Sequence, residues 1–233
     1  MAGGKQSPRQ KMINLMYLVF ICMLALNMSK EVLAAFGLMN VKMETSNSKT
    51  TESNDQFLAS LAVKSEEDKV KYGEVYQKAN QIKVISQEYF DYLETLKKGM
   101  LKGVEDPTDY QVMDKADYLN EHFFQGDNLT EGGQEFMKRI NDYRSEITKL
   151  VPQGLQSSVA SRFEVGDENG KVENRDKAKV DWIDYHYKDF PLIASLTKLT
   201  ALQADIKSTE EDALKSMLEG ELTDQVSLTN FAT

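Results

Sequence analysis

Cysteine and histidine are scarce in this sequence. Its 233 residues include one cysteine, Cys22, and two histidines, His122 and His186. One cysteine cannot form an intramolecular disulfide, so the fold has to be held by its hydrophobic core alone. The two histidines stand far apart, and no cysteine or carboxylate accompanies either of them at the spacing of a metal site. The sequence therefore predicts neither a disulfide scaffold nor a metal centre.

Familiar catalytic motifs are also missing. The chain contains no phosphate-binding loop, no G-x-S-x-G element and no cysteine beside a base. Its formal net charge is −9, and this becomes −12 for residues 12–233 once the three cations Lys5, Arg9 and Lys11 are set aside. An acidic chain lacks the basic face that nucleic-acid binding requires. We therefore expect a protein that is not an enzyme, has no cofactor and binds no nucleic acid.

The longest apolar run lies near the N-terminus. Residues 12–29, MINLMYLVFICMLALNMS, carry no formal charge, and the apolar pattern resumes from Val32 to Met39. A helix rises about 1.5 Å per residue and the hydrocarbon core of a bilayer is about 30 Å thick, so a span needs about twenty apolar residues. Ser7-Pro8 is a favourable helix start, with serine as the N-cap and proline at the first helical position. We predict a transmembrane helix with its extension over 12–39, in contact with the lipid bilayer.

A cleaved signal peptide is the alternative for this run, because it also begins with basic residues. The run is long for a signal peptide and no A-x-A-like cleavage site follows it, so a retained anchor is favoured. The three N-terminal cations precede the run without an acid, whereas Lys30 and Glu31 cancel after it. Positive charge stays on the cytoplasmic side. This predicts a single-pass protein with residues 1–11 in the cytoplasm and the bulk of the chain exported.

Helical periodicity dominates the exported part. Positions that are apolar, with the exception of Ser86, recur mostly at steps of four and three, as in packed helices. They are Val75, Ala79, Ile82, Ser86, Tyr89, Leu93, Leu96 and Met100; then Phe136, Ile140, Tyr143, Ile147 and Leu150; and last Leu192, Leu196, Leu199 and Ile206. We predict one long helix from about residue 44 to about 103, a shorter one from Asp109 to Phe124, and a last one from Asp189 to about Glu219. Three or four long helices with short connections form an up-and-down bundle.

A β-hairpin is the one predicted departure from helix. Asn169-Gly170 between short flanking segments is a strong hairpin signal, and it predicts a hairpin near 162–175. A calcium loop is disfavoured there, because glycine stands at the wrong place and no glutamate closes a twelve-residue frame. The predicted fold class is therefore mainly α. The helical-bundle domain covers 40–223, and 224–233 begins a linker to further domains.

One face of the predicted membrane helix carries a stripe of residues. Steps of four and three join Arg9, Ile13, Met16, Phe20, Met23 and Asn27, and Tyr17 lies two turns above Arg9 on nearly the same side. On one interpretation Arg9 is a positive-inside anchor and Tyr17 a buried aromatic. On the other, Arg9 faces a carboxylate on a partner helix, because ionisable groups near the membrane core are costly unless paired. The residues alone leave both interpretations open.

Two long segments of the chain resemble the GldM family, called PorM in non-gliding bacteria. They are residues 5–40, KQSPRQKMINLMYLVFICMLALNMSKEVLAAFGLMN, and residues 190–214, FPLIASLTKLTALQADIKSTEEDAL. The resemblance extends over the whole chain and corresponds to the membrane anchor and first periplasmic domain of that family. It implies a bacterial inner-membrane protein with its bulk in the periplasm, acting in the type IX secretion system. The later β-rich periplasmic domains of the family have no counterpart in these residues.

The resemblance also implies partners and a mode of action. GldM-like proteins are homodimers whose membrane helices sit within a ring of a second inner-membrane protein, GldL. The pair is understood as a motor driven by the proton-motive force. Through the later domains it moves a periplasmic ring of GldK and GldN, and thereby powers secretion and, in gliding species, motility.

The resemblance to GldM suggests a specific role for the stripe on the membrane helix. A proton-driven motor needs a carboxylate at membrane depth, and residues 12–29 contain none, so the proton carrier is expected on the partner. Arg9 would pair with that carboxylate when it is deprotonated, and Tyr17 would donate a hydrogen bond on the same face. Two other classes of function stay open: a passive scaffold that spans the periplasm, and a membrane-anchored helical-bundle sensor.

Overall fold

The computed structural model describes residues 7–115 and 117–231, without the side chains of 24–29, 117 and 220–231. Helices make up most of this part of the chain. They are α1 (Pro8–Glu67), α2 (Lys69–Leu101), the 3-10 helix η1 (Tyr110–Val112), α3 (Asp117–Phe123), α4 (Glu131–Leu150), α5 (Gln153–Arg162), α6 (Trp182–Tyr187) and α7 (Leu192–Phe231). The described strands are β1 (Phe124–Gln125), β2 (Asn128–Leu129), β3 (Lys171–Glu173) and β4 (Lys179–Asp181). The mainly α prediction is confirmed.

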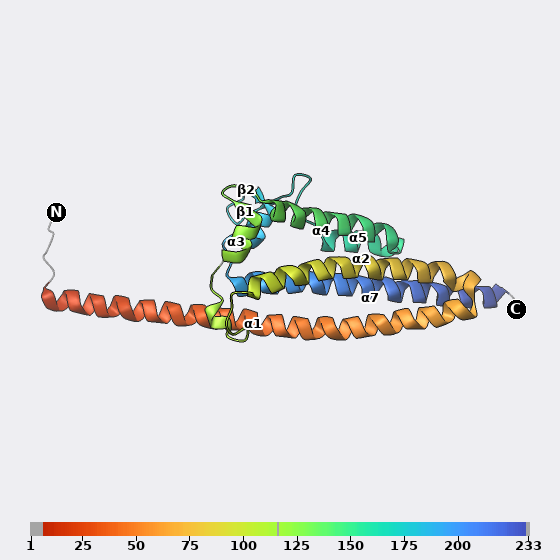
Figure 1. Cartoon of the computed structure of the whole chain (residues 1–233), viewed down its shortest axis with the longest axis horizontal. Helices are drawn as coiled ribbons and strands as arrows, with labels where there is room; N and C mark the ends of the chain where they lie inside the picture. Colours follow the sequence, from red (N-terminus) through yellow and green to blue (C-terminus); the bar gives the residue numbers. More distant parts are fainter. Residues whose placement is uncertain (1–6, 116, 232–233) are drawn as a thin grey trace.

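The molecule is a long rod with a smaller lobe on one side (Figure 1). The first part of α1 projects as a free arm, and the rest of α1 packs against α2 and α7 along the rod. We call the projecting part, residues 8–30, the arm, and the packed helices the bundle. The segment from α3 to α6 forms the lobe, in which α4 packs on α2. Because this segment returns the chain to the arm side, α7 runs parallel to α1, while α2 runs antiparallel to both.

The start of α1 follows its sequence. Ser7 caps the helix by accepting a hydrogen bond from the Gln10 amide at 3.3 Å, and Pro8 occupies the first turn. The helix then continues through 60 residues, about 90 Å at 1.5 Å per residue. It crosses the Ser-, Thr- and Asn-rich residues 40–56 without a break.

The prediction of one helix from about 44 to about 103 is wrong. The chain leaves helical geometry at Asp68, with φ −141° and ψ 86°, and reverses direction into α2. The Asp68 carboxylate accepts from the Lys71 amide at 3.1 Å and so caps α2. An aspartate at this position satisfies one of the amides that a helix start leaves unpaired. Neither glycine nor proline marks the turn, which is why periodicity missed it.

The predicted apolar faces form the core. The α2 face is buried from Ala79 to Met100, and the α4 face from Phe136 to Ile147. In α7, Leu196, Leu199 and Ile206 are buried. The ends of these faces, Val75, Leu150 and Leu192, are partly buried instead. Apart from Ala79, which packs with Leu61 and Leu214, the buried apolar residues of these faces belong to one hydrophobic cluster that joins the bundle to the lobe.

Two short segments differ from their predictions. The hairpin lies at 171–181 and not near 162–175: β3 pairs with β4 around residues 174–178. Asn169-Gly170 forms a separate turn before it, because the Asp167 carboxylate accepts from the Asn169 and Lys171 amides and Gly170 adopts φ +69°. The predicted helix from Asp109 to Phe124 is split into η1 and α3. A second hairpin, β1–β2, follows α3 and was not predicted from the sequence.

Candidate functional site

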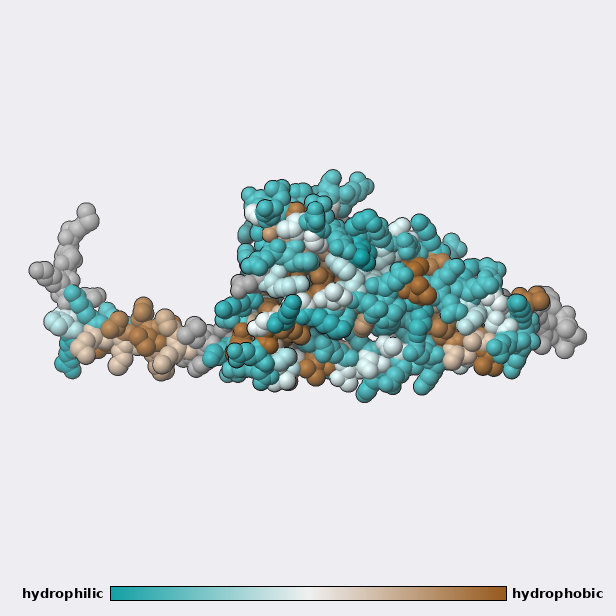
Figure 2. Space-filling model, viewed as in Figure 1, coloured by the Kyte–Doolittle hydropathy of each residue, from teal (hydrophilic) through white to brown (hydrophobic). Residues whose placement is uncertain are grey.

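The arm carries the residues that the sequence singled out for the membrane. Ile13, Met16, Tyr17, Phe20 and Met23 line one shallow apolar surface together with Val19. Their side chains are between 46% and 72% exposed, and the arm is the most uniformly apolar surface in view (Figure 2). Arg9 is exposed two turns before Tyr17 on α1. Asn27 lies outside the described side chains. The structure thus gathers five of the predicted residues on one face, and Arg9 lies near the N-terminal end of the arm.

Membrane insertion itself stays a prediction. In the part of the chain that the structure describes, which leaves out the side chains of 24–29 within the predicted span, no helix contains a segment long and apolar enough to cross a membrane.

The contact between α1 and α7 is built on asparagines. Asn40, Asn47 and Asn54 recur every seven residues on α1 and are 4%, 6% and 0% exposed. Asn47 Nδ2 donates to the Thr200 carbonyl at 3.3 Å, and Asn54 Nδ2 donates to the Lys207 carbonyl at 3.1 Å. Both bonds join residues 153 positions apart, as parallel helices in fixed register require. From α7, Thr197 Oγ1 lies 3.2 Å from the Phe36 carbonyl of α1.

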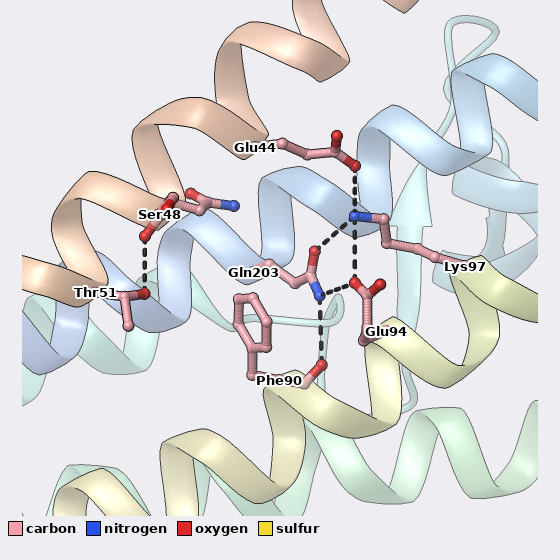
Figure 3. Close-up of a pocket in the computed structure, with 8 residues that line it drawn as sticks. Glu44, Ser48, Thr51, Phe90, Glu94, Lys97 and Gln203 are labelled. Atoms are coloured by element: carbon pink, nitrogen blue, oxygen red, sulfur yellow. Dashed lines mark hydrogen bonds and ion pairs between the residues drawn. The ribbon is translucent and has the colours of Figure 1, made fainter. Parts of the chain in front are cut away.

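A charged cluster lies beside this contact, where α1, α2 and α7 meet (Figure 3). Lys97 of α2 is 5% exposed, and its ammonium lies 2.8 Å from Glu44 Oε1 and 3.0 Å from Gln203 Oε1. Glu94 Oε2 is 3.5 Å from the same ammonium and accepts from Gln203 Nε2 at 3.2 Å. The cluster borders a cavity of about 300 Å³. Because Lys97 of α2 contacts Glu44 of α1 and Gln203 of α7, the cluster ties the three helices together.

We call the end of the bundle from which the arm projects the foot. It is covered by the segment between α2 and α3. A Cβ atom on Gly37 of α1 would lie 2.1 Å from the Tyr110 ring, so glycine is needed for this close approach. The same segment binds α7, because the Leu192 and Ile193 amides donate to the Lys115 and Met113 carbonyls at 2.8 and 3.3 Å. The point at which the arm leaves the bundle is therefore held from two sides.

The lobe is joined to the bundle through a buried hydroxyl pair. Tyr143 Oη of α4 lies 3.1 Å from Ser86 Oγ of α2. Burial raises the pKa of the Tyr143 phenol well above its ordinary value, so the group stays neutral and hydrogen-bonded. Within the lobe, His122 stacks on the Tyr118 ring, and the His186 ring lies against Trp182 at a tilt of 40°. Among the described residues, no group of His, Cys, Asp or Glu side chains is arranged to hold a metal ion.

Sequence reasoning missed the asparagines and the Lys97 cluster. Asn40, Asn47 and Asn54 lie in the Ser-, Thr- and Asn-rich residues 40–56, where the apolar period that marks a buried helix face is missing. Their seven-residue spacing was the available signal, because asparagine occurs at core heptad positions, where it specifies helix register.

Comparison with known proteins agrees with this architecture. The family model described as GldM N-terminal domain matches residues 31–220, from the foot of the bundle into α7. No curated protein matches the chain. The family match extends over well more than half of the sequence and includes the α1–α7 contact, the Lys97 cluster and the lobe. The chain belongs to the GldM family, and residues 31–220 are its N-terminal domain.

Proposed function

We propose that this chain is part of the proton-motive-force-driven inner-membrane motor that powers type IX secretion and gliding motility, and that it transmits motion across the periplasm. GldM family membership implies a role in gliding motility and type IX secretion. The family consists of inner-membrane proteins that act as structural or motor components rather than as classical enzymes. The motor, its energy source and its partners are the proposal.

The continuity of α1 is the observation that carries the proposal. The arm and the bundle share one helix from Pro8 to Glu67. A rotation or tilt of the arm therefore reaches the bundle without passing through a flexible joint. The charged cluster around Lys97 and the closed foot at Gly37 bind α1 to α2 and α7, so the bundle would move with α1 as one body.

The arm supplies the contact with the energy-converting partner. Residues 12–29 carry no acid, so the proton-carrying carboxylate would belong to a GldL-like ring around the arms of a homodimer. Moving one charge across 100 mV supplies about 2.3 kcal/mol, and a cation that pairs with the deprotonated carboxylate can hold it until protonation releases it. Arg9 would be that cation, and Tyr17 would donate a hydrogen bond on the same face. Motion would pass through later domains to a GldK/GldN-like ring.

The first test is Arg9→Ala in the full-length protein in cells, with Lys11→Ala as the matched control. Both variants remove one N-terminal cation, and therefore weaken the positive-inside signal equally. Arg9 stands on the stripe with Ile13 and Met16, whereas Lys11 lies on another side of the helix. We expect Arg9→Ala to stop secretion and gliding, and Lys11→Ala to leave both close to wild type. Co-purification of the GldL-like partner checks that the complex still assembles.

A passive scaffold predicts a different pattern. It needs the complex to assemble but needs no charge on the stripe, so both variants would secrete and glide normally. That result would reject the role of Arg9 and the motor proposal in its present form. Loss of assembly with Arg9→Ala alone would instead make Arg9 a structural contact of the ring.

A further inference from the structure

We propose that Asn47 and Asn54 are positioning residues that fix the register of α1 on α7, so that displacement of α1 is passed to α7 without slippage. The inference rests on the proposed function, in which α1 receives motion from the membrane. It concerns the step after that input, where motion leaves α1 for a neighbouring helix.

The acceptors of the two amides are main-chain carbonyls. The Thr200 and Lys207 carbonyls belong to the α7 helix itself, so a change of side-chain rotamer cannot move them. Asn54 is 0% exposed, so water is unavailable there as a substitute partner, whereas Asn47 is 6% exposed and lines the cavity beside Lys97. Each amide is therefore bound to one axial position on α7, and the two bonds lie one heptad apart.

Small slips between the helices would break both bonds. A shift of one residue moves a helical position by about 1.5 Å and rotates it by about 100°, which takes the amide away from its carbonyl. A buried donor left without a partner costs about 1–3 kcal/mol. A shift of α1 along α7 by one to six residues would break both hydrogen bonds together. It is therefore opposed at Asn47 and at Asn54.

A slip of one whole heptad is opposed by the residues that flank the asparagines. Leu33 and Leu61 continue the α1 heptad series at either end, and both are buried. Leu61 packs with Leu214 in a separate apolar cluster. A one-heptad slip would bring Leu61 to the level of the buried, charged Lys207. The heptad series of α1, with three asparagines in the middle and a leucine at each end, therefore fits α7 in one register.

The asparagines contribute specificity at the expense of stability. Within the described residues, Asn40 Oδ1 and Asn54 Oδ1 are buried and accept no hydrogen bond. Leucine at these positions would bury more apolar surface and leave no polar atom unpaired. A polar residue at a core heptad position is known to fix register at a cost in stability. We infer that register is what these positions provide.

The test measures register and output in the same variant, Asn47→Leu combined with Asn54→Leu. Spin labels are placed at Thr45→Cys on α1 and Lys215→Cys on α7, both exposed, with Cys22 replaced by serine in the purified full chain. In the observed register the labels are separated by roughly 25 Å along the bundle axis, from 17 residues at 1.5 Å each. Pulsed dipolar spectroscopy then gives the distance distribution, and secretion and gliding are measured in cells.

The doubly labelled chain is diluted into unlabelled chain, so that labels on the two members of a homodimer do not contribute. We then expect the native chain to give a single distance. The double leucine variant should keep its helicity and thermal stability, yet show a second distance shifted by up to about 10 Å, one heptad, together with loss of secretion and gliding. Asn141→Leu is the matched control, because the Asn141 amide donates to the Met137 carbonyl of its own helix. It should change neither readout. The single variants Asn47→Leu and Asn54→Leu replace the double variant if that protein does not fold.

Three results would overturn the inference. They are an unchanged single distance, whatever the output; a shifted distance with normal secretion and gliding; and an equal effect of Asn141→Leu. The distance measurement needs no energised membrane, so its outcome is independent of the Arg9 test. If Arg9→Ala is harmless while the leucine variant slips and loses output, the motor proposal fails and the register role survives as a structural one.

Discussion

At the scale of single residues, the bundle core contains charge as well as hydrocarbon. Lys207 and Glu210 of α7 are 2% and 1% exposed at their side chains, with Nζ 3.2 Å from Oε2. The same ammonium lies 3.4 Å from Gln87 Oε1 and above the Phe90 ring. Removing two charges from water costs about as much as their attraction returns, so such a pair adds little net stability. Breaking it is costly, because one charge is then buried alone.

Glu210→Gln is therefore expected to lower the free energy of unfolding by about 3–5 kcal/mol. Replacing both members, Lys207→Met with Glu210→Leu, should return the free energy of unfolding to near or above the native value, since no charge remains buried. Urea denaturation followed by circular dichroism measures both.

Glu211→Gln is the control for this cycle. It breaks an exposed i,i+4 pair with Lys215 on the same helix and should cost less than about 1 kcal/mol. An equal loss from Glu210→Gln and Glu211→Gln would show that burial does not set the cost.

Burial could be predicted from the sequence for the apolar residues but not for these polar ones. Steps of four and three identified nearly all of the buried faces of α2, α4 and α7, because burial of a helix face requires apolar residues at that period. Lys97, Lys207 and Glu210 look like solvated surface in the sequence, since lysine and glutamate are rarely buried unless paired. Their pairing depends on residues from other helices or on their depth in the fold, which no local pattern encodes.

At the scale of elements, the turn at Asp68 decides the shape of the molecule. Without it α1 and α2 would continue as one rod about half as long again as α1, and α2 would not fold back onto α1. The turn lies in a charged stretch, Lys64–Lys69, where the apolar period is interrupted. An interrupted period is compatible with an exposed helix or with a turn, and only the capping role of Asp68 separates them.

Asp68→Ala should destabilise the domain by about 1 kcal/mol, the usual value of a helix N-cap. Asp68→Asn keeps a side-chain oxygen for the Lys71 amide and should lie within a few tenths of a kcal/mol of the native protein. Denaturant titration of both variants measures the difference. Equal losses would mean that the carboxylate charge, and not the cap, stabilises the turn.

At the scale of the whole molecule, the arm and the bundle have a defined rotational phase. The stripe with Ile13 and Met16 and the buried asparagines lie on one uninterrupted helix, so the angle between the arm's contact face and the bundle is set by the number of residues between them. The proposed function uses that angle, because a ring contact on one face of the arm must direct motion into the bundle. A passive scaffold would not depend on it.

Insertions after Lys30 test this dependence. Two alanines rotate the arm by about 200° relative to the bundle, whereas seven rotate it by about 700° and restore its phase to within about 20°, although they lengthen the helix by about 10 Å. We expect two alanines to stop secretion and gliding and seven to retain them at least in part. Measured output that falls steadily with the length of the insertion would show that distance, and not phase, matters.

The parallel course of α1 and α7 has a mechanical consequence. The arm leaves the rod at one end, and the last described turns of α7 lie at the other (Figure 1). Tension that enters through α1 and leaves through α7 would therefore load their contact in shear, so that all the contacts between the two helices resist at the same time. If α7 ran antiparallel to α1, the same tension would break these contacts one after another at much lower force. The topology of this domain thus favours a joint that holds under tension.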